Sequence, residues 1–269
     1  MRTLIHLSDL HFGRADPAIV TPLLEFIQET KPDLVAVSGD LTQRARTAQF
    51  EEARKFLAAI PFRKIIVPGN HDVPLHNVFA RLFRMLDRFR RYICANLEPF
   101  YLDDEIAVAG VNTTRALTGK NGRINRRQLE KLRQRFARVS PTHVKIVVTH
   151  HPFDLPPGVE GDRVVGRSRL AMKVLAEIRV DMLLAGHFHI GGTRNATARY
   201  EMTDYCALII AAGTSISTRG RGQPNSFNVI KIDVPSATIL QYRWRPDSVR
   251  FNLASEEKFV RHSDGWTRV

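Results

Sequence analysis

The feature that most constrains the fold is an alternation, over the first half of the chain, of short β-branched runs with longer amphipathic stretches. Strand-like runs at residues 4–8, 34–38 and 65–68 are separated by stretches of helical periodicity near 17–30 and 47–60. This alternation is typical of βαβ units, which build a largely parallel sheet. Because the second and third runs are almost continuously apolar, we expect both faces of that sheet to be covered.

The second half of the chain continues this alternation and then changes. Strands are predicted at residues 106–111, 144–149 and 183–185, and a helix at about 125–138 separates the first two. Consecutive strand-like runs then follow without helices between them, at residues 206–212, 227–234 and 238–244. Runs of this kind favour an antiparallel sheet.

Length and composition favour a single domain. A chain of 269 residues, 43% of them hydrophobic, can bury a sizeable core. We expect one domain over residues 1–245, with a helical insertion at about 74–97 and a tail at 246–269 that no pattern assigns. No apolar run approaches bilayer-spanning length and no leader precedes the first strand, so we expect a cytoplasmic protein. With only Cys94 and Cys206, neither a disulfide framework nor a thiolate zinc site is expected.

The net charge of +13 predicts attraction to polyanions. Arginines crowd one predicted helix, residues 78–93, where Arg81, Arg84, Arg88 and Arg91 form a stripe beside an apolar one. A basic amphipathic helix can lie on an anionic membrane surface, which would make the protein peripheral to the membrane. We favour the alternative, an ordinary helix that packs on the core and exposes its arginines.

Residues of the kind that bind metals follow five of the predicted strands. The clusters are Asp9-x-His11, Gly39-Asp40, Gly69-Asn70-His71-Asp72, His150-His151 and Gly186-His187-x-His189. In α/β sheets, ligands bind outside the carboxyl ends of the strands, so we expect the clusters to converge there. One such cluster is common by chance, but five in this order predict a metal site. Carboxylate, imidazole and amide ligands without thiolate suit Mn, Fe or Zn.

The order and content of these clusters resemble the signature of the calcineurin-like metallophosphoesterases, which runs D-x-H, GD, GNH[D/E], H and GHxH. All five blocks are intact and span residues 9–189. The resemblance implies an α/β fold, a four-layer αββα sandwich of two mixed β-sheets, with a dinuclear metal site at the C-terminal edge of the strands. It also implies two divalent metal ions, with the choice among Mn, Fe and Zn left open.

Carried over by position, the resemblance implies seven metal ligands. Asp9, His11 and His189 would bind the first metal, Asn70, His150 and His187 the second, and Asp40 would bridge both. A carboxylate is a natural bridge, because its two oxygens can bind two cations about 3.5 to 4 Å apart. The family motif reads His-x-Pro at the fourth block, which selects His150 and leaves His151 as a neighbour.

The resemblance also implies a mechanism, in which hydroxide held by the two metals attacks phosphorus in line with the leaving oxygen. His71 is similar to the family's histidine that contacts the phosphate and protonates the leaving group, and Asp72 would orient its ring. The alternative is that His71 only fixes its loop.

A small phosphodiester is the expected substrate. The segments 8–13 and 39–42 look like those of the branch that contains bacterial class III cyclic-nucleotide phosphodiesterases. The alternative substrate is a lipid-linked pyrophosphate of the UDP-diacylglucosamine type, hydrolysed at the membrane surface. A nuclease is suggested by charge alone, and the chain lacks the aromatic and basic interleaving that stacks single-stranded bases, so nucleic acid is not the expected partner. A non-catalytic interaction scaffold on the same fold would be expected to have lost ligands, and none is lost here.

Overall fold

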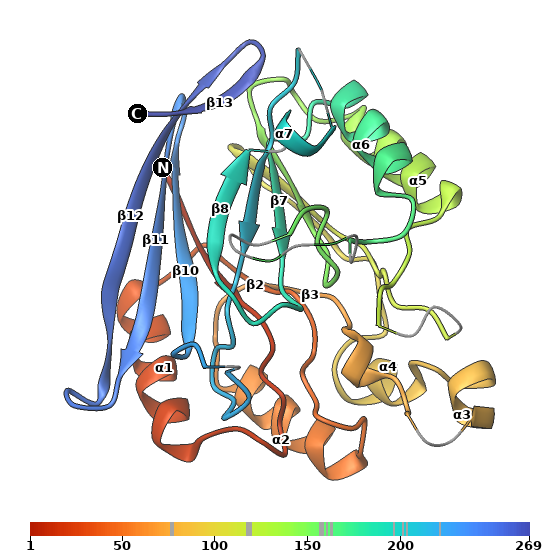
Figure 1. Ribbon diagram of the computed structural model, residues 1–269, viewed down its shortest axis with the longest axis vertical. Coiled ribbons are helices and arrows are strands. Elements are labelled where there is room, and N and C mark those ends of the chain that lie inside the picture. The colour runs from red at the N-terminus through yellow and green to blue at the C-terminus, as the bar shows by residue number, and fades with distance from the viewer. Residues whose placement is uncertain are drawn as a thin grey trace.

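The computed structural model describes residues 1–269 except 76–77, 117–119, 156–158, 160, 162–163, 196, 201, 203 and 221. Its strands form two sheets that lie face to face (Figure 1). None of the helices in the described part of the chain is long and apolar enough to cross a membrane.

The first sheet contains the βαβ units of the N-terminal half. Its strands are β1 (Arg2–Leu7), β2 (Leu34–Val37), β3 (Lys64–Ile66), β10 (Ser226–Asp233), β11 (Ser236–Arg245), β12 (Arg250–His262) and β13 (Gly265–Arg268). They lie in the order β13-β12-β11-β10-β1-β2-β3. β1, β2 and β3 pair in parallel, whereas β10 pairs antiparallel with β1 and successive hairpins add the other three. The chain beyond residue 246, to which no pattern assigned a structure, therefore forms two strands at one edge of this sheet.

The second sheet is also mixed. Its strands are β4 (Phe100–Leu102), β5 (Ile106–Gly110), β6 (Val144–Val148), β7 (Met182–Ala185), β8 (Gly192–Asn195) and β9 (Leu208–Ala211), in the order β4-β5-β6-β7-β9-β8. The expectation that residues 206–212 form one antiparallel sheet with 227–234 and 238–244 is wrong. β9 lies in the second sheet, where it pairs in parallel with β7 and antiparallel with β8, whereas β10 and β11 lie in the first sheet. All four residues of β9 are buried, as suits an interior strand covered on both faces.

Helices cover the outer face of each sheet. They are α1 (Pro17–Thr30) and α2 (Thr47–Ala58) on the first sheet, and α5 (Arg126–Phe136) and α6 (Ser168–Glu177) on the second. The alternation of side chains along a strand divides the core accordingly. Ile5 of β1 packs with α1 and α2, whereas its neighbour Leu4 packs between the sheets with Val108 and Ile146. The expected four-layer αββα sandwich is therefore confirmed.

A short 3-10 turn (Asn70–Asp72) and three short helices complete the fold: α3 (Val78–Phe83), α4 (Asp87–Tyr92) and α7 (Thr197–Tyr200). The expectation of one helix over residues 78–93 is wrong, because the helix breaks between α3 and α4. Leu86 and Phe89 are buried and Tyr92 stacks on Phe50 of α2, so α4 packs on the core. Phe79, Leu82 and Phe83 of α3 are exposed instead, so the two halves of the segment have different surroundings and form separate helices.

Candidate metal centre

The five polar clusters lie where parallel strands end. Asp9 and His11 follow β1, Asp40 follows β2, Asn70 and His71 follow β3, His150 follows β6, and His187 and His189 follow β7. Backbone hydrogen bonds join the first two loops, from Asp9 N to Gly39 O at 3.1 Å and from His11 N to Asp40 O at 2.9 Å. Strands from both sheets therefore deliver the clusters to one edge of the sandwich.

Five of these residues hold a left-handed backbone, which is uncommon for residues other than glycine. The φ angles are 53° at Asp9, 45° at His11, 51° at Asp40, 79° at His187 and 65° at His189. Such a conformation costs roughly 1 kcal/mol per residue, and strained positions of this kind gather at functional sites.

Two glycines of the motifs leave room for the carboxylates. A Cβ atom at Gly69 would overlap Asp40 Oδ1, and one at Gly186 would overlap the hydroxyl of Ser8 and approach Asp9 Oδ2 to 2.6 Å. Any side chain at these positions would therefore displace Asp9 or Asp40. The glycines of the GNHD and GHFH blocks are needed for this space.

The first group of ligand atoms surrounds Asp9. His11 Nε2 lies 3.6 Å and His189 Nε2 3.7 Å from Asp9 Oδ1, and His11 Nε2 lies 3.8 Å from Asp40 Oδ2. Asp9 Oδ1 and both ring nitrogens of His11 are buried without a hydrogen-bond partner among the described residues. Buried polar atoms are rarely left unsatisfied, so Asp9 Oδ1 and His11 Nε2 fit the donor set of a divalent cation.

The second group shares Asp40 with the first. Asp40 Oδ2 lies 3.4 Å from His150 Nε2, and Asn70 Oδ1 lies 3.1 Å from both His150 Nε2 and His187 Nδ1. Ligand atoms that each bind one ion at about 2.1 Å lie on the order of 3 to 3.5 Å apart. The donor set therefore fits a second cation beside the first, with Asp40 between them.

Hydrogen bonds to the opposite side of three of the ligands fix their orientation. Asp9 Oδ2 accepts from Ser8 Oγ and from the backbone N–H of His187, at 2.7 and 3.0 Å. Asp40 Oδ1 accepts from His71 N at 2.7 Å. His150 Nδ1 donates to Ser38 O at 2.8 Å, which turns Nε2 toward the second group.

His151 lies next to two of the candidate ligands. Its ring centroid is 4.9 Å from those of His150 and His187, and the three rings could jointly hold an ion. Its Nδ1 pairs with Thr113 Oγ1 at 2.7 Å, and its buried Nε2 lacks a hydrogen bond in the described structure. Asn70 Oδ1 contacts the rings of His150 and His187.

The charges of the metal-free site are strongly perturbed. Burial opposes charge on His150, but the carboxylate of Asp40 outweighs it and raises the pKa of His150 to about 9. Burial likewise favours neutral Asp40, yet the charge of His150 holds the pKa of Asp40 well below its usual range. Burial and the charge of His150 lower the pKa of His187 to about 3. Of the histidines in the second group, His150 therefore has the strongest tendency to hold a proton.

Asp72 does not hold the His71 ring, and this expectation is corrected. Its carboxylate accepts from the backbone N–H groups of Gly69, Leu41 and Thr42 at 2.9 to 3.2 Å. Successive side chains of a 3-10 turn point about 120° apart. Asp72 therefore points back under the loops, whereas His71 lines a cleft that Arg219 also lines. Burial and the Asp40 charge raise the pKa of Asp72 to about 6.

The His71 ring is held instead by groups outside the motifs. Its Nδ1 donates to Gln43 O at 2.9 Å, and its Nε2 lies 2.8 Å from Arg219 Nη1. Burial lowers the pKa of His71. A neutral ring that donates from Nδ1 accepts at Nε2, so the guanidinium of Arg219 donates to it.

Sequence reasoning missed several residues that touch the site, among them Thr214 and Arg219. Thr214 pairs its hydroxyl with His189 Nδ1, and Arg219 contacts His71. Thr214 follows β9, a further parallel strand that ends at the same edge, so the rule that identified the five clusters applies to it as well. Arg219 lies in a later loop and belongs to no motif.

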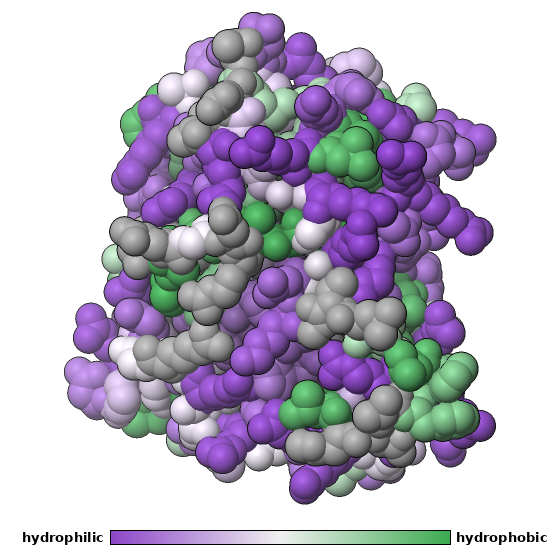
Figure 2. All heavy atoms as spheres, turned by 45° about the vertical axis from the view of Figure 1, so that its right-hand side comes forward, coloured by the Kyte–Doolittle hydropathy of each residue, from purple (hydrophilic) through white to green (hydrophobic). Residues whose placement is uncertain are grey.

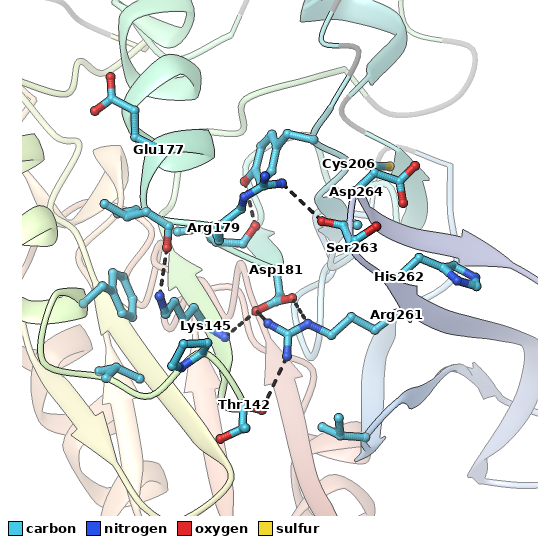
Figure 3. A pocket seen from close by; sticks show the side chains of 18 of the residues that line it. Thr142, Lys145, Glu177, Arg179, Asp181, Cys206, Arg261, His262, Ser263 and Asp264 are labelled. Atoms are coloured by element: carbon cyan, nitrogen blue, oxygen red, sulfur yellow. Dashed lines mark hydrogen bonds and ion pairs between the residues drawn. The ribbon is translucent and has the colours of Figure 1, made fainter.

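A cavity of about 970 Å³ lies at the opposite ends of the strands of the second sheet. Figure 3 shows Arg261 reaching Asp181, with a shortest distance of 2.8 Å, and Lys145 Nζ donates to Ile178 O at 3.0 Å. Asp181 also accepts from Trp266 Nε1 at 3.0 Å. These contacts join the β12–β13 hairpin to the second sheet. The polar residues of this cavity therefore stabilise the fold, and the cavity lies away from the ligand cluster.

Two relatives of the chain carry the same name. It is 35% identical over 81 residues to the glycerophosphodiester phosphodiesterase GpdQ of Enterobacter lignolyticus, which covers 26% of this chain and 29% of that protein. It is 23% identical over 235 residues to a probable glycerophosphodiester phosphodiesterase GpdQ of Arcobacter nitrofigilis, which covers 85% and 76%. The chain thus spans less than a third of the length of the first relative and about three quarters of the second.

Two solved structures share the fold. A purple acid phosphatase from yellow lupin has a TM-score of 0.70 at 10% identity, over 96% of this chain and 53% of that one. A dimetal phosphatase from Danio rerio has a TM-score of 0.64 at 13% identity, over 88% of this chain and 95% of that one.

The family model of the calcineurin-like phosphoesterases matches residues 2–191, more than half of the sequence, and includes all five clusters. The chain belongs to the calcineurin-like phosphoesterase family.

Proposed function

We propose that this protein is a phosphoric ester hydrolase that depends on two divalent metals and acts on phosphodiesters. The observation that carries the proposal is the pair of adjoining ligand groups that share Asp40. Family membership implies a dinuclear divalent metal site, and the protein has the Asp and His groups for it. The names of both GpdQ relatives support a diester rather than a monoester substrate.

We assign the two groups as ligands of the two ions. Asp9, His11 and His189 would hold one ion, Asn70, His150 and His187 the other, and Asp40 both. Bound there, divalent ions supply neutralisation of phosphate charge and activation of water at neutral pH. The chain itself provides neutral imidazoles and one amide beside two carboxylates, so the ligands leave most of the cationic charge for the substrate.

His71 and Arg219 stand beside this cluster on the side of the cleft. His71 Nε2 accepts from Arg219, so in this state the ring has no proton at the atom that faces the cleft. We therefore assign His71 to phosphate binding, with Arg219 supplying a permanent positive charge next to it. Proton donation by His71 would first require the ring to gain a proton, which its lowered pKa opposes.

A lipid-linked substrate at a membrane is the second candidate, and one observation favours it. Phe79 and Phe83 of α3 are 64% and 71% exposed, and Leu75 and Leu82 are also exposed. Figure 2 shows hydrophobic side chains gathered at the lower right of the molecule, the end where α3 lies in Figure 1. The reading of this segment as a helix packed on the core holds for α4 but not for α3.

A substrate panel tests the proposal. Protein loaded with Mn²⁺ is assayed on a small aryl phosphodiester, cyclic nucleotides, glycerophosphodiesters, a lipid-linked pyrophosphate and simple monoesters. We expect higher kcat/KM for at least one diester than for any monoester. A clear preference for monoesters would contradict the proposal, and a preference for the lipid-linked pyrophosphate would select the second candidate.

A further inference from the structure

A cleft beside the ligand cluster is lined by cations alone among its charged groups. This cavity of about 330 Å³ has Asn70 and His71 on one wall, and four of its nine lining residues are cationic. The four are Arg44, Arg81, Lys120 and Arg219. No Asp or Glu lines it within the described residues. The cleft therefore has a strongly positive electrostatic potential, and it lies next to the candidate metal ligands.

The four cations come from separate parts of the chain. Arg44 follows β2, Arg81 lies on α3, Lys120 follows β5 and Arg219 follows β9. Two of them are held in place: Arg81 Nε donates to Ala116 O at 2.7 Å and Arg219 Nη1 donates to His71. No carboxylate in the described structure forms an ion pair with Arg44, Arg81 or Lys120. Like charges that gather without a counterion repel one another, and a bound anion would relieve the repulsion.

The cations exceed what a simple diester requires. A phosphodiester carries one negative charge, which the metal cluster and His71 would already receive. Arg44 and Lys120 are exposed side chains that line this cleft, so they could reach a group beyond that phosphate. Val73 and Leu75 supply an apolar wall of the same cleft, suited to the carbon skeleton that joins two charged groups.

Resting on the proposed function, we infer that this cleft binds a second anionic group of the substrate, such as a phosphate carried beyond the scissile diester. The substrate class is then a phosphodiester with at least one further anion. Arg44, Arg81 and Lys120 bind this anion, and Arg219 lies between it and the scissile phosphate.

A pair of dinucleotides that differ by one terminal phosphate tests the inference. Both contain the same scissile diester, and only one carries a 5′-phosphate. We expect the metal-loaded enzyme to favour the 5′-phosphorylated dinucleotide by about tenfold or more in kcat/KM, mainly through KM, as one charge-assisted contact provides. The double variant Arg44→Gln/Lys120→Gln should bring this ratio close to one, because the loss in kcat/KM falls mainly on the 5′-phosphorylated dinucleotide.

The matched control removes the same charge elsewhere. Lys231 and Arg245 are exposed on β10 and β11 of the first sheet, and Lys231→Gln/Arg245→Gln should leave the ratio unchanged. Equal kcat/KM for the two dinucleotides in the wild type, or an equal loss of preference in the control variant, would overturn the inference. If neither dinucleotide is cleaved, the proposed function is in question. Calorimetric titration of the same loaded protein then decides on the cleft, because equal affinity for the two dinucleotides would refute it.

Discussion

Within the second ligand group, two adjacent histidines have different surroundings. His150 Nε2 faces Asp40 and Asn70, whereas His151 Nδ1 is engaged by Thr113. We expect His150→Ala to lower metal occupancy and activity by more than the 10–100-fold typical of losing an outer hydrogen-bond partner. His151→Ala should be milder, because it removes no assigned ligand. Metal content and kcat/KM of both variants are the measurements, and the reverse ranking would show that the ligand assignment is shifted by one residue.

The proton on His150 predicts a pH dependence of metal binding. The pKa of His150 is raised to about 9 in the metal-free protein, so below that pH an incoming ion must displace a proton. The apparent affinity should therefore rise with pH between 6 and 9, by up to about tenfold per unit. Competition with a chelator at several pH values measures it. An affinity that is constant over this range would contradict the protonated state of His150.

At the scale of elements, the exposed helix α3 offers a direct test of the lipid-surface candidate. Burying one phenylalanine side chain in an apolar phase contributes about 2 kcal/mol, and each nearby arginine contributes about 1 kcal/mol at an anionic surface. If α3 docks on a membrane, the protein should sediment with anionic vesicles and Phe79→Ser/Phe83→Ser should abolish this. Leu102→Ser/Leu253→Ser, at two exposed leucines on β4 and β12, is the matched control. Wild-type protein that stays in the supernatant at physiological salt would rule out the lipid-surface candidate.

The four arginines of this segment have different surroundings, because the segment forms two helices rather than one. Arg81 lines the cationic cleft, and Arg88 Nη1 donates to Ala45 O at 2.7 Å. Arg84 and Arg91 are exposed. The four arginines therefore do not form one membrane-facing row, and a variant that replaced all four would combine unrelated effects.

How far the sequence predicts these elements depends on how regular their surroundings are. β1 and β2 follow from short apolar, β-branched runs, and α1 and α2 follow from the 3.6-residue period of an amphipathic helix, because each element keeps the same surroundings along its whole length. The break between α3 and α4 leaves no such signal, since the apolar stripe continues across it. β12 was not identified because only Phe251 and Phe259 of its thirteen residues are buried.

The candidate ligands could be predicted because each follows a strand in a short motif. The residues that form hydrogen bonds with the site histidines could not be predicted in this way. Gln43 and Thr113 reach the histidines through tertiary contacts between loops, and neither stands in a recognisable pattern.

At the scale of the whole molecule, Asp181 links the last hairpin to the second sheet. It accepts from Lys145 N, Arg261 and Trp266. Removing one partner of a buried ion pair costs about 3 kcal/mol or more, so Asp181→Ala should lower the free energy of unfolding by about that amount. Denaturant unfolding of the metal-loaded protein measures the change. A loss of less than about 1 kcal/mol would mean that the hairpin is held by apolar packing alone.

The assembly of both sheets around one edge serves a single purpose in the proposed function, which is to bring two metal ions together at Asp40. Elemental analysis of fully active enzyme tests this most directly, with Asp40→Asn as the comparison. We expect two divalent ions per wild-type chain. The variant should keep its fold by circular dichroism, lose at least one ion and lose most of its activity. Full activity with no more than one ion per chain, or an Asp40→Asn variant that retains both ions and full activity, would contradict the two-metal site.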